Sequence, residues 1–126
     1  MDLMELFEIK VDLIEDGLVK GSMPVKEKHT QAFGFLHGGA SIVFAESLAG
    51  IGSMHMLEDG KVAAGVSVNS KHLKPKKVGG FIHAIAVLKE ETTTKHIWQI
   101  IIKDDSNETI HISVIECRIV DSSLFK

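Results

Sequence analysis

The chain has 126 residues and a formal net charge of −3, and 44% of its residues are hydrophobic and 25% charged. This length and composition are typical of one globular domain with a sizeable core, so we expect a single domain over residues 1–126 rather than two domains or a disordered chain. The negative charge, one Trp and no Tyr argue against a nucleic-acid-binding protein.

No segment of the chain is typical of a targeting signal or a membrane span. The first ten residues, MDLMELFEIK, carry acidic side chains and lack the basic region and apolar core of a secretory signal. The longest charge-free run, residues 30–45, is interrupted by glycines and polar groups. Cys117 is the only cysteine, which excludes an internal disulfide and suits a reducing compartment. We expect a cytoplasmic protein with no membrane partner.

The chain begins with a short helix and a β-hairpin. Residues 2–8 can form an amphipathic helix, although so short a helix is stable only when it docks on the rest of the fold. Apolar and polar side chains alternate over residues 7–14, Asp16-Gly17 supplies a turn, and residues 18–24 form the return strand, which ends at its proline. Residues 26–39 predict a loop with an apolar tip.

Residues 39–57 predict the only long helix of the chain. Ala, Leu, Met and Phe are frequent in it and proline is absent. The segment is apolar nearly all round, which is typical of a buried helix. Small residues make it thin, and Gly50 and Gly52 favour the close approach of another backbone layer.

Four segments rich in β-branched residues follow a turn at residues 58–60. They cover residues 62–73, 81–88, 95–103 and 109–120, and turn residues separate them. Short connections favour antiparallel pairing of successive strands, because a parallel step needs a crossover of a dozen or more residues. One long apolar helix and an antiparallel sheet bury each other most economically when the sheet curves round the helix. The predicted fold class is therefore α+β.

Glu46 is the only formally charged side chain between Lys28 and Glu58. A carboxylate in apolar surroundings is costly unless it is hydrogen-bonded or paired. One interpretation is a glutamate at the rim of a helix interface whose carboxylate reaches water. The other interpretation is catalytic. A glycine-rich loop opens the helix, and the free N–H groups there can polarise a carbonyl. A carboxylate one to two turns further along the helix can then act as base or nucleophile. The residues alone leave both interpretations open.

This segment resembles the active-site segment of the hotdog-fold acyl-CoA thioesterases, in the branch that includes the PaaI, 4-hydroxybenzoyl-CoA and dihydroxynaphthoyl-CoA types. The resemblance rests, at fixed spacing, on Gln31, His37-Gly38-Gly39-Ala40-Ser41 and Glu46-Ser47. The order of hairpin, loop, long helix and four strands is similar to that family over essentially the whole chain, as is Trp98-Gln99-Ile100. The resemblance implies one hotdog domain, a central helix wrapped by a curved antiparallel sheet, that hydrolyses an aryl- or fatty-acyl-CoA to the free acid and CoA.

The resemblance also implies a role for each matching residue. Glu46 would be the catalytic carboxylate, acting on the thioester carbonyl directly or through water. The Gly38 N–H would polarise that carbonyl, and Gln31 and His37 would support the site.

The sequence departs from the family one helical turn after the glutamate. A Ser or Thr often stands there and helps to hold the attacking water, whereas this chain has Gly50. Either Ser47 or Ser53 supplies the hydroxyl, or the water is held less well, or the reaction proceeds through an acyl-enzyme anhydride.

A basic cluster, KHLKPKK, covers residues 71–77. Taken alone, such a run is typical of a solvated strand end. In a thioesterase of this kind the phosphates of CoA need cationic partners at the mouth of the pocket, and the resemblance points to His72 and Lys74. Lys95 and His96 are weaker candidates.

We expect no metal site and no cofactor, since CoA is part of the substrate. The seven histidines include no pair at i, i+4 on a helix and have no neighbouring cysteine. Cys117 in mid-strand is interpreted as a small packing residue.

The resemblance further implies a homodimer, assembled into a tetramer, with each active site formed between the helix N-terminus of one subunit and Glu46 of the other. Two other functions stay open. A related hotdog lineage hydrates or dehydrates acyl thioesters with a histidine paired to an acidic residue, which His37 and Glu46 could mimic. A non-catalytic acyl-CoA binding domain is the second, and the missing hydroxyl at Gly50 favours it.

Overall fold

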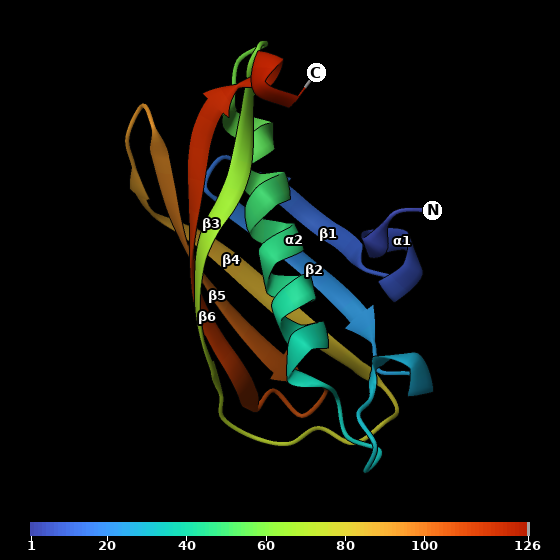
Figure 1. The fold of residues 1–126 in the computed structure, drawn as a ribbon. Helices are drawn as coiled ribbons and strands as arrows, with labels where there is room; N and C mark the ends of the chain where they lie inside the picture. The colour runs from blue at the N-terminus through green and yellow to red at the C-terminus, as the bar shows by residue number, and fades with distance from the viewer. Residues whose placement is uncertain (126) are drawn as a thin grey trace.

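The computed structural model describes residues 1–125 and shows one long helix lying against one face of a six-stranded sheet (Figure 1). Its elements are α1 (Leu3–Phe7), β1 (Lys10–Glu15), β2 (Leu18–Pro24), the 3-10 helix η1 (Glu27–His29), α2 (Gly38–Met56), β3 (Lys61–His72), β4 (Phe81–Glu91), β5 (Lys95–Asp104), β6 (Thr109–Asp121) and η2 (Ser122–Phe125). The predicted α+β class is confirmed, and α2 begins and ends one residue earlier than expected. Within residues 1–125, no helix is long and apolar enough to cross a membrane.

The strands pair antiparallel in the order β1-β2-β4-β5-β6-β3. The expectation that successive strands pair is wrong for β3 and β4, because β3 lies at the far edge against β6. The connection between β3 and β4, residues 73–80, crosses three strand spacings of about 4.8 Å each. Eight residues can cross this distance, since an extended chain reaches about 3.3 Å per residue.

The first strand starts later than predicted because the chain reverses after α1. Glu8 caps α1 in the left-handed conformation with φ 59°, so Phe7 belongs to the helix rather than to β1. Buried His29 joins α1 to the loop before α2. Lys26 N–H donates to His29 Nδ1 at 3.0 Å, so the ring proton lies on Nε2 and is donated to Phe7 O at 2.8 Å.

One face of α2 packs on the sheet and the opposite face is open. The buried residues are Ala40, Ser41, Phe44, Ala45, Leu48, Ala49, Gly52 and Ser53. A Cβ at Gly52 would lie 2.5 Å from the Trp98 ring, so the predicted close approach of another layer is confirmed there, whereas no atom lies within 4 Å of a Cβ at Gly50. The expectation of a helix buried all round is wrong, because Glu46 and Met54 on the outward face are exposed in the single chain.

β3 forms an open edge of the sheet. Residues 65–69 are all exposed, and Val66 keeps 53% of its surface accessible. Unpaired backbone groups beside apolar side chains make such an edge a template for pairing with another strand.

Candidate active site

The helix α2 opens with two glycines behind a histidine cap. His37 is the N-cap residue, and its Nδ1 accepts a hydrogen bond of 2.8 Å from the Gly39 N–H. The Gly38 N–H, at the first helical position, has no acceptor among residues 1–125. A free N–H at the positive end of a helix dipole can bind a developing oxyanion.

This helix start faces a cavity of about 400 Å³. Its lining includes Gln31, Gly38, Ser41, His72, Lys74 and Lys76. Four residues predicted for the site, from the loop, the helix and the end of β3, are therefore brought together. Gln31 also shapes the loop, because its amide oxygen accepts hydrogen bonds from the Phe33 and Phe35 N–H groups.

The His72 ring lies directly against Gly38. A Cβ at position 38 would be 2.8 Å from His72 Nε2, so a larger residue there would displace the ring. The other nitrogen of the ring, Nδ1, lies 3.1 Å from Nδ1 of His111, a buried residue on β6. Sequence reasoning did not identify His111 because its contact with His72 depends on the pairing of β3 with β6.

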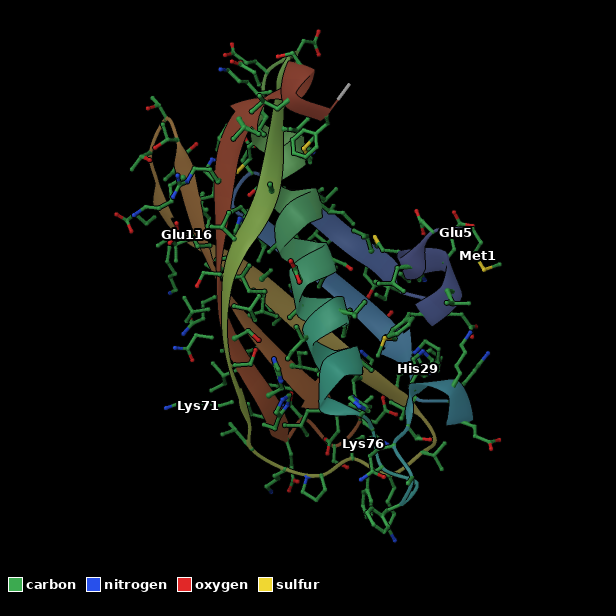
Figure 2. All side chains as sticks on the ribbon, in the orientation of Figure 1. Met1, Glu5, His29, Lys71, Lys76 and Glu116 are labelled. Carbon is green, nitrogen blue, oxygen red and sulfur yellow. The ribbon has the colours of Figure 1, made fainter. Side chains whose placement is uncertain are left out.

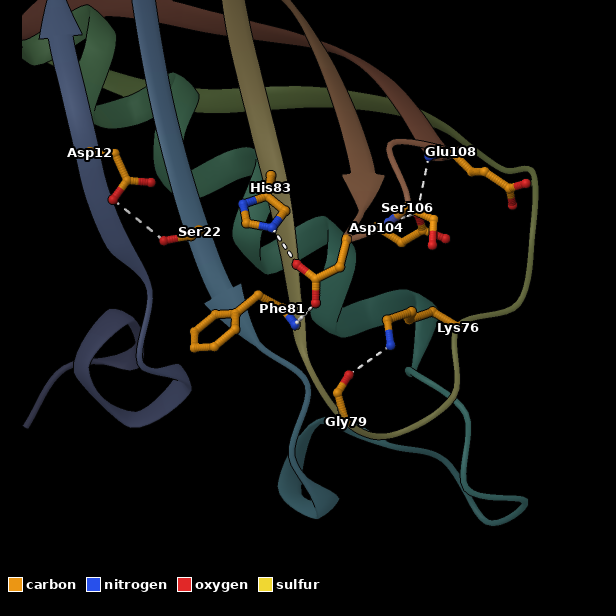
Figure 3. A network of polar contacts seen from close by, with 10 residues as sticks. Asp12, Ser22, Lys76, Gly79, Phe81, His83, Asp104, Ser106 and Glu108 are labelled. Carbon is orange, nitrogen blue, oxygen red and sulfur yellow. Dashed lines mark hydrogen bonds and ion pairs between the residues drawn. The ribbon is translucent and has the colours of Figure 1, made fainter.

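Two lysines at this end of the molecule, Lys74 and Lys76, are already engaged by the protein. Lys74 Nζ forms an ion pair of 2.9 Å with Glu108, and both side chains are exposed. Lys76, which lies below the first turn of α2, donates to the backbone oxygen of Gly79 at 2.7 Å (Figures 2 and 3). Lys71 points away from the molecule. Lys74 lines the cavity and is exposed, so a phosphate could reach it by competing with Glu108.

Glu46 does not reach this cavity within its own chain. It is exposed on the outward face of α2, and its carboxylate covers Gly65 of β3, where a Cβ would lie 2.5 Å from Oε1. At a rise of about 1.5 Å per residue, the eight residues from Gly38 to Glu46 separate them by about 12 Å along the helix. The expectation that both groups act on one carbonyl from the same helix is wrong. The same separation excludes a pair between His37 and Glu46 in one chain, so the pair of the hydratase alternative would also need a second copy.

The two serines considered as substitutes for the missing hydroxyl differ. Ser53 faces the core, where its Oγ accepts a 2.8 Å hydrogen bond from Trp98 Nε1 and lies 2.8 Å from His96 Nδ1. It cannot hold an attacking water on the outward face. Ser47 is half-buried beside Glu46 and stays a candidate.

Lys95 and His96 do not join the group around Gly38. They begin β5, in register with Arg118 and Cys117, whereas His72 ends β3 in register with His111 near the opposite end of β6. His96 is 2% exposed, and burial lowers its pKa, an effect partly opposed by nearby Glu91. The expectation that His96 faces CoA phosphate is therefore wrong, and it is a core residue.

Burial of His111 makes stability depend on pH. Burial lowers the pKa of His111 from 6.5 to about 4, and neighbouring His72 adds to the shift. Above pH 6.5 neither state is protonated, whereas between pH 6.5 and 4 only the unfolded chain gains this proton. We expect His111 to contribute about 3 kcal/mol to the stability lost across this window in urea unfolding at fixed protein concentration. His111→Gln should remove this contribution and leave that of buried His96, and an unchanged slope in the variant would contradict the assignment.

Comparisons with known proteins show the family of the chain. A model of the thioesterase superfamily matches residues 33–111. The 1,4-dihydroxy-2-naphthoyl-CoA hydrolase of Listeria monocytogenes is 34% identical over 113 residues, which cover 90% of this chain and 91% of the relative. A thioesterase from Staphylococcus aureus is 36% identical, with a TM-score of 0.92 over 95% of this chain and 99% of that chain. The PaaI protein of Escherichia coli has a TM-score of 0.85 at 15% identity, covering 93% of this chain and 83% of its own, and shows the fold alone.

The resemblance seen in the sequence is thus confirmed, and the six-stranded sheet around one long helix is the hotdog fold. The chain belongs to the thioesterase superfamily, a family of thioester-hydrolysing enzymes.

Proposed function

We propose that the protein hydrolyses acyl-CoA thioesters in a site shared by two copies of the chain. The observation that carries this proposal is the free Gly38 N–H at the start of α2, facing a cavity with basic side chains at its rim. The thioester carbonyl would accept a hydrogen bond from this N–H, which stabilises the charge that develops on its oxygen.

A second copy of the chain would supply the missing carboxylate. The open edge of β3 and the open face of α2 lie side by side, since Glu46 covers Gly65. A two-fold axis near Val68 would pair two β3 edges antiparallel. The start of β3 in one copy would then lie beside the end of β3 in the other. Glu46 of the partner, beside the partner's Gly65, would lie level with His72 and Gly38. The proposed unit is therefore a homodimer, and further association into a tetramer is part of the same proposal.

The partner's Glu46 has two possible chemical roles. As a general base it takes a proton from water, and the hydroxide attacks the carbonyl carbon. As a nucleophile it forms an anhydride that water then hydrolyses. In both routes the C–S bond breaks, CoA leaves as the thiol after taking up a proton, and the acyl group leaves as the acid. Water and the carboxylate supply every atom needed, so the proposal includes no metal or cofactor.

The known relatives support this choice of residues. Structures of the Staphylococcus aureus thioesterase were solved with one glutamate or one glutamine replaced by alanine. Those two positions are separated by the same number of residues as Gln31 and Glu46 in this chain. A thioesterase of Pseudomonas aeruginosa, 30% identical, was likewise solved with a glutamine replaced. We therefore assign Gln31 and Glu46 to the site, with His37 as the residue that caps the helix start.

Lys74 provides a test of how CoA binds. Lys74→Ala removes a cation at the rim of the cavity, and we expect KM for acyl-CoA to rise by about three- to tenfold with little change in kcat. Glu108→Gln is the matched variant, because it releases Lys74 from its 2.9 Å ion pair and should lower KM. Both shifts should shrink at high salt. Equal KM values in the three proteins would remove Lys74 from the proposal.

The acyl group is proposed to be aromatic. Two relatives named 1,4-dihydroxy-2-naphthoyl-CoA hydrolase, from Listeria monocytogenes and Escherichia coli, are 34% and 28% identical to this chain. The test measures free thiol released from aryl-CoA and fatty-acyl-CoA thioesters, with hydration of an enoyl-CoA followed in parallel. A higher kcat/KM for aryl-CoA supports the proposal. If every thioester binds and none releases thiol, the chain is a binding domain instead.

A further inference from the structure

A chain of hydrogen-bonded groups runs from the interior of the sheet to the start of α2. Ser70 Oγ on β3 lies 2.9 Å from Ser113 Oγ on β6, and Ser113 Oγ is in turn hydrogen-bonded to His111 Nε2. His111 Nδ1 then meets His72 Nδ1 at 3.1 Å. The ring of His72 ends the chain with its Nε2 edge against Gly38. This hydrogen-bonded network therefore connects the buried Ser113 and His111 to the cavity in which the substrate is proposed to bind.

Burial keeps the interior half of this hydrogen-bonded network uncharged. Ser113 is 0% and His111 1% exposed, whereas His72 is exposed toward the cavity. Because burial lowers the pKa of His111 to about 4, this ring carries a single proton at neutral pH. Two nitrogens that face each other at hydrogen-bond distance need one proton between them. The proton on His111 and the proton on His72 are therefore coupled.

The hydrogen bonds of this network can run in two directions, and in either direction every group has a partner. In the inward direction, His72 Nδ1–H donates to His111 Nδ1, and His111 Nε2–H donates to Ser113 Oγ. A neutral His72 then has no proton on Nε2, the nitrogen beside the helix start. In the outward direction, Ser113 donates to His111 Nε2, His111 Nδ1–H donates to His72, and His72 keeps its proton on Nε2. Only the outward direction lets a neutral His72 donate a hydrogen bond beside the Gly38 N–H.

We propose that His111 is a positioning residue that holds the His72 ring against Gly38 and fixes its proton on Nε2, so that His72 donates a second hydrogen bond to the bound thioester. This inference rests on the proposed function for the identity of the ligand. It gives His72 a role in the reaction itself, in addition to the contact with CoA phosphates that the family resemblance implies. His72 contacts the substrate, whereas His111, Ser113 and Ser70 act through it.

The spectroscopic test reads the tautomer of His72 directly. Protein labelled with ¹⁵N is studied by NMR at neutral pH with a non-hydrolysable thioether analogue of an aryl-CoA. We expect His72 to carry its proton on Nε2 alone in the wild type. In His111→Phe, which keeps a ring but removes both nitrogens, the proton should distribute over both His72 nitrogens. His111→Asn, whose side-chain amide can donate at the position of Nδ1, should restore the Nε2 form.

The kinetic test separates this role from general damage to the core. We expect His111→Phe to lower kcat by about tenfold with KM changed less than about twofold, and His111→Asn to recover most of the rate. Ile102→Val is the matched control, because Ile102 is 0% exposed and stands opposite His111 on β5. It should lower the melting temperature without altering kcat or the His72 signal.

Each result bears on one claim only. An unchanged His72 tautomer in His111→Phe overturns the inference, whatever the rate. If His111→Phe matches the wild type in kcat while Glu46→Gln is inactive, the proposed function stands and the inference fails. If the wild type releases no thiol from any thioester, the proposed function fails, and the NMR comparison still decides whether His111 controls His72.

Discussion

Glu46→Gln is expected to lower kcat for thioester hydrolysis by a factor of about 10² to 10⁴. The amide keeps the size of the side chain and its position over Gly65, but it neither accepts a proton from water nor attacks a carbonyl. Because Glu46 is exposed in the single chain, the substitution should leave the fold intact. Thiol release under saturating acyl-CoA measures the loss, and the affinity for a non-hydrolysable analogue should change little.

The matched control is Glu90→Gln, which removes the same charge from an exposed position on β4. It should be as active as the wild type. A Glu46→Gln protein with more than about half of the wild-type kcat would show that Glu46 is only the solvated rim glutamate of the simpler interpretation.

Gly38→Pro should lower kcat by at least about a hundredfold, because proline has no N–H to polarise the carbonyl. The backbone accepts proline here, since position 38 is the first of α2, where proline is favoured. His37 has φ −70° and ψ 132°, which is the conformation required before a proline. Circular dichroism should therefore show an intact helix while thiol release is lost.

Gly38→Ala is the control for this substitution. Its Cβ pushes against His72 Nε2 as the proline ring does, but its N–H is retained. It should lose activity by much less than Gly38→Pro. Equal losses in the two variants would mean that displacement of His72, rather than loss of the N–H, accounts for the effect.

Local features of the sequence predicted most of the fold. The apolar run without proline located α2 to within one residue at each end, because helix propensity and length are local properties. The position of β3 at the edge was not predictable in the same way. It depends on a connection that crosses the sheet. The pattern of buried side chains shows which face of a strand is covered, but not which strand lies beside it.

The sequence brought forward several residues that the structure places around one cavity, but not their contacts. The glycine opening at Gly38 and the basic residues after β3 do meet in one cavity. The separation of Gly38 from Glu46 could already be calculated from the helical rise, and the proposal of a shared site rests on it. By contrast, His72 and His96 look alike in the sequence, each beside a lysine at a strand end. Only the sheet register shows that one reaches the cavity and the other is buried.

The most direct test of the shared site is complementation between two inactive variants. Glu46→Gln and Gly38→Pro chains are produced together with different tags, and the mixed dimers are assayed for thiol release. In a mixed dimer, one site combines the intact Gly38 of one chain with the intact Glu46 of the other. Random association should therefore restore about a quarter of the wild-type rate, since half of the dimers are mixed and each has one complete site. A rate no higher than that of the two parent variants would contradict a site shared between two copies.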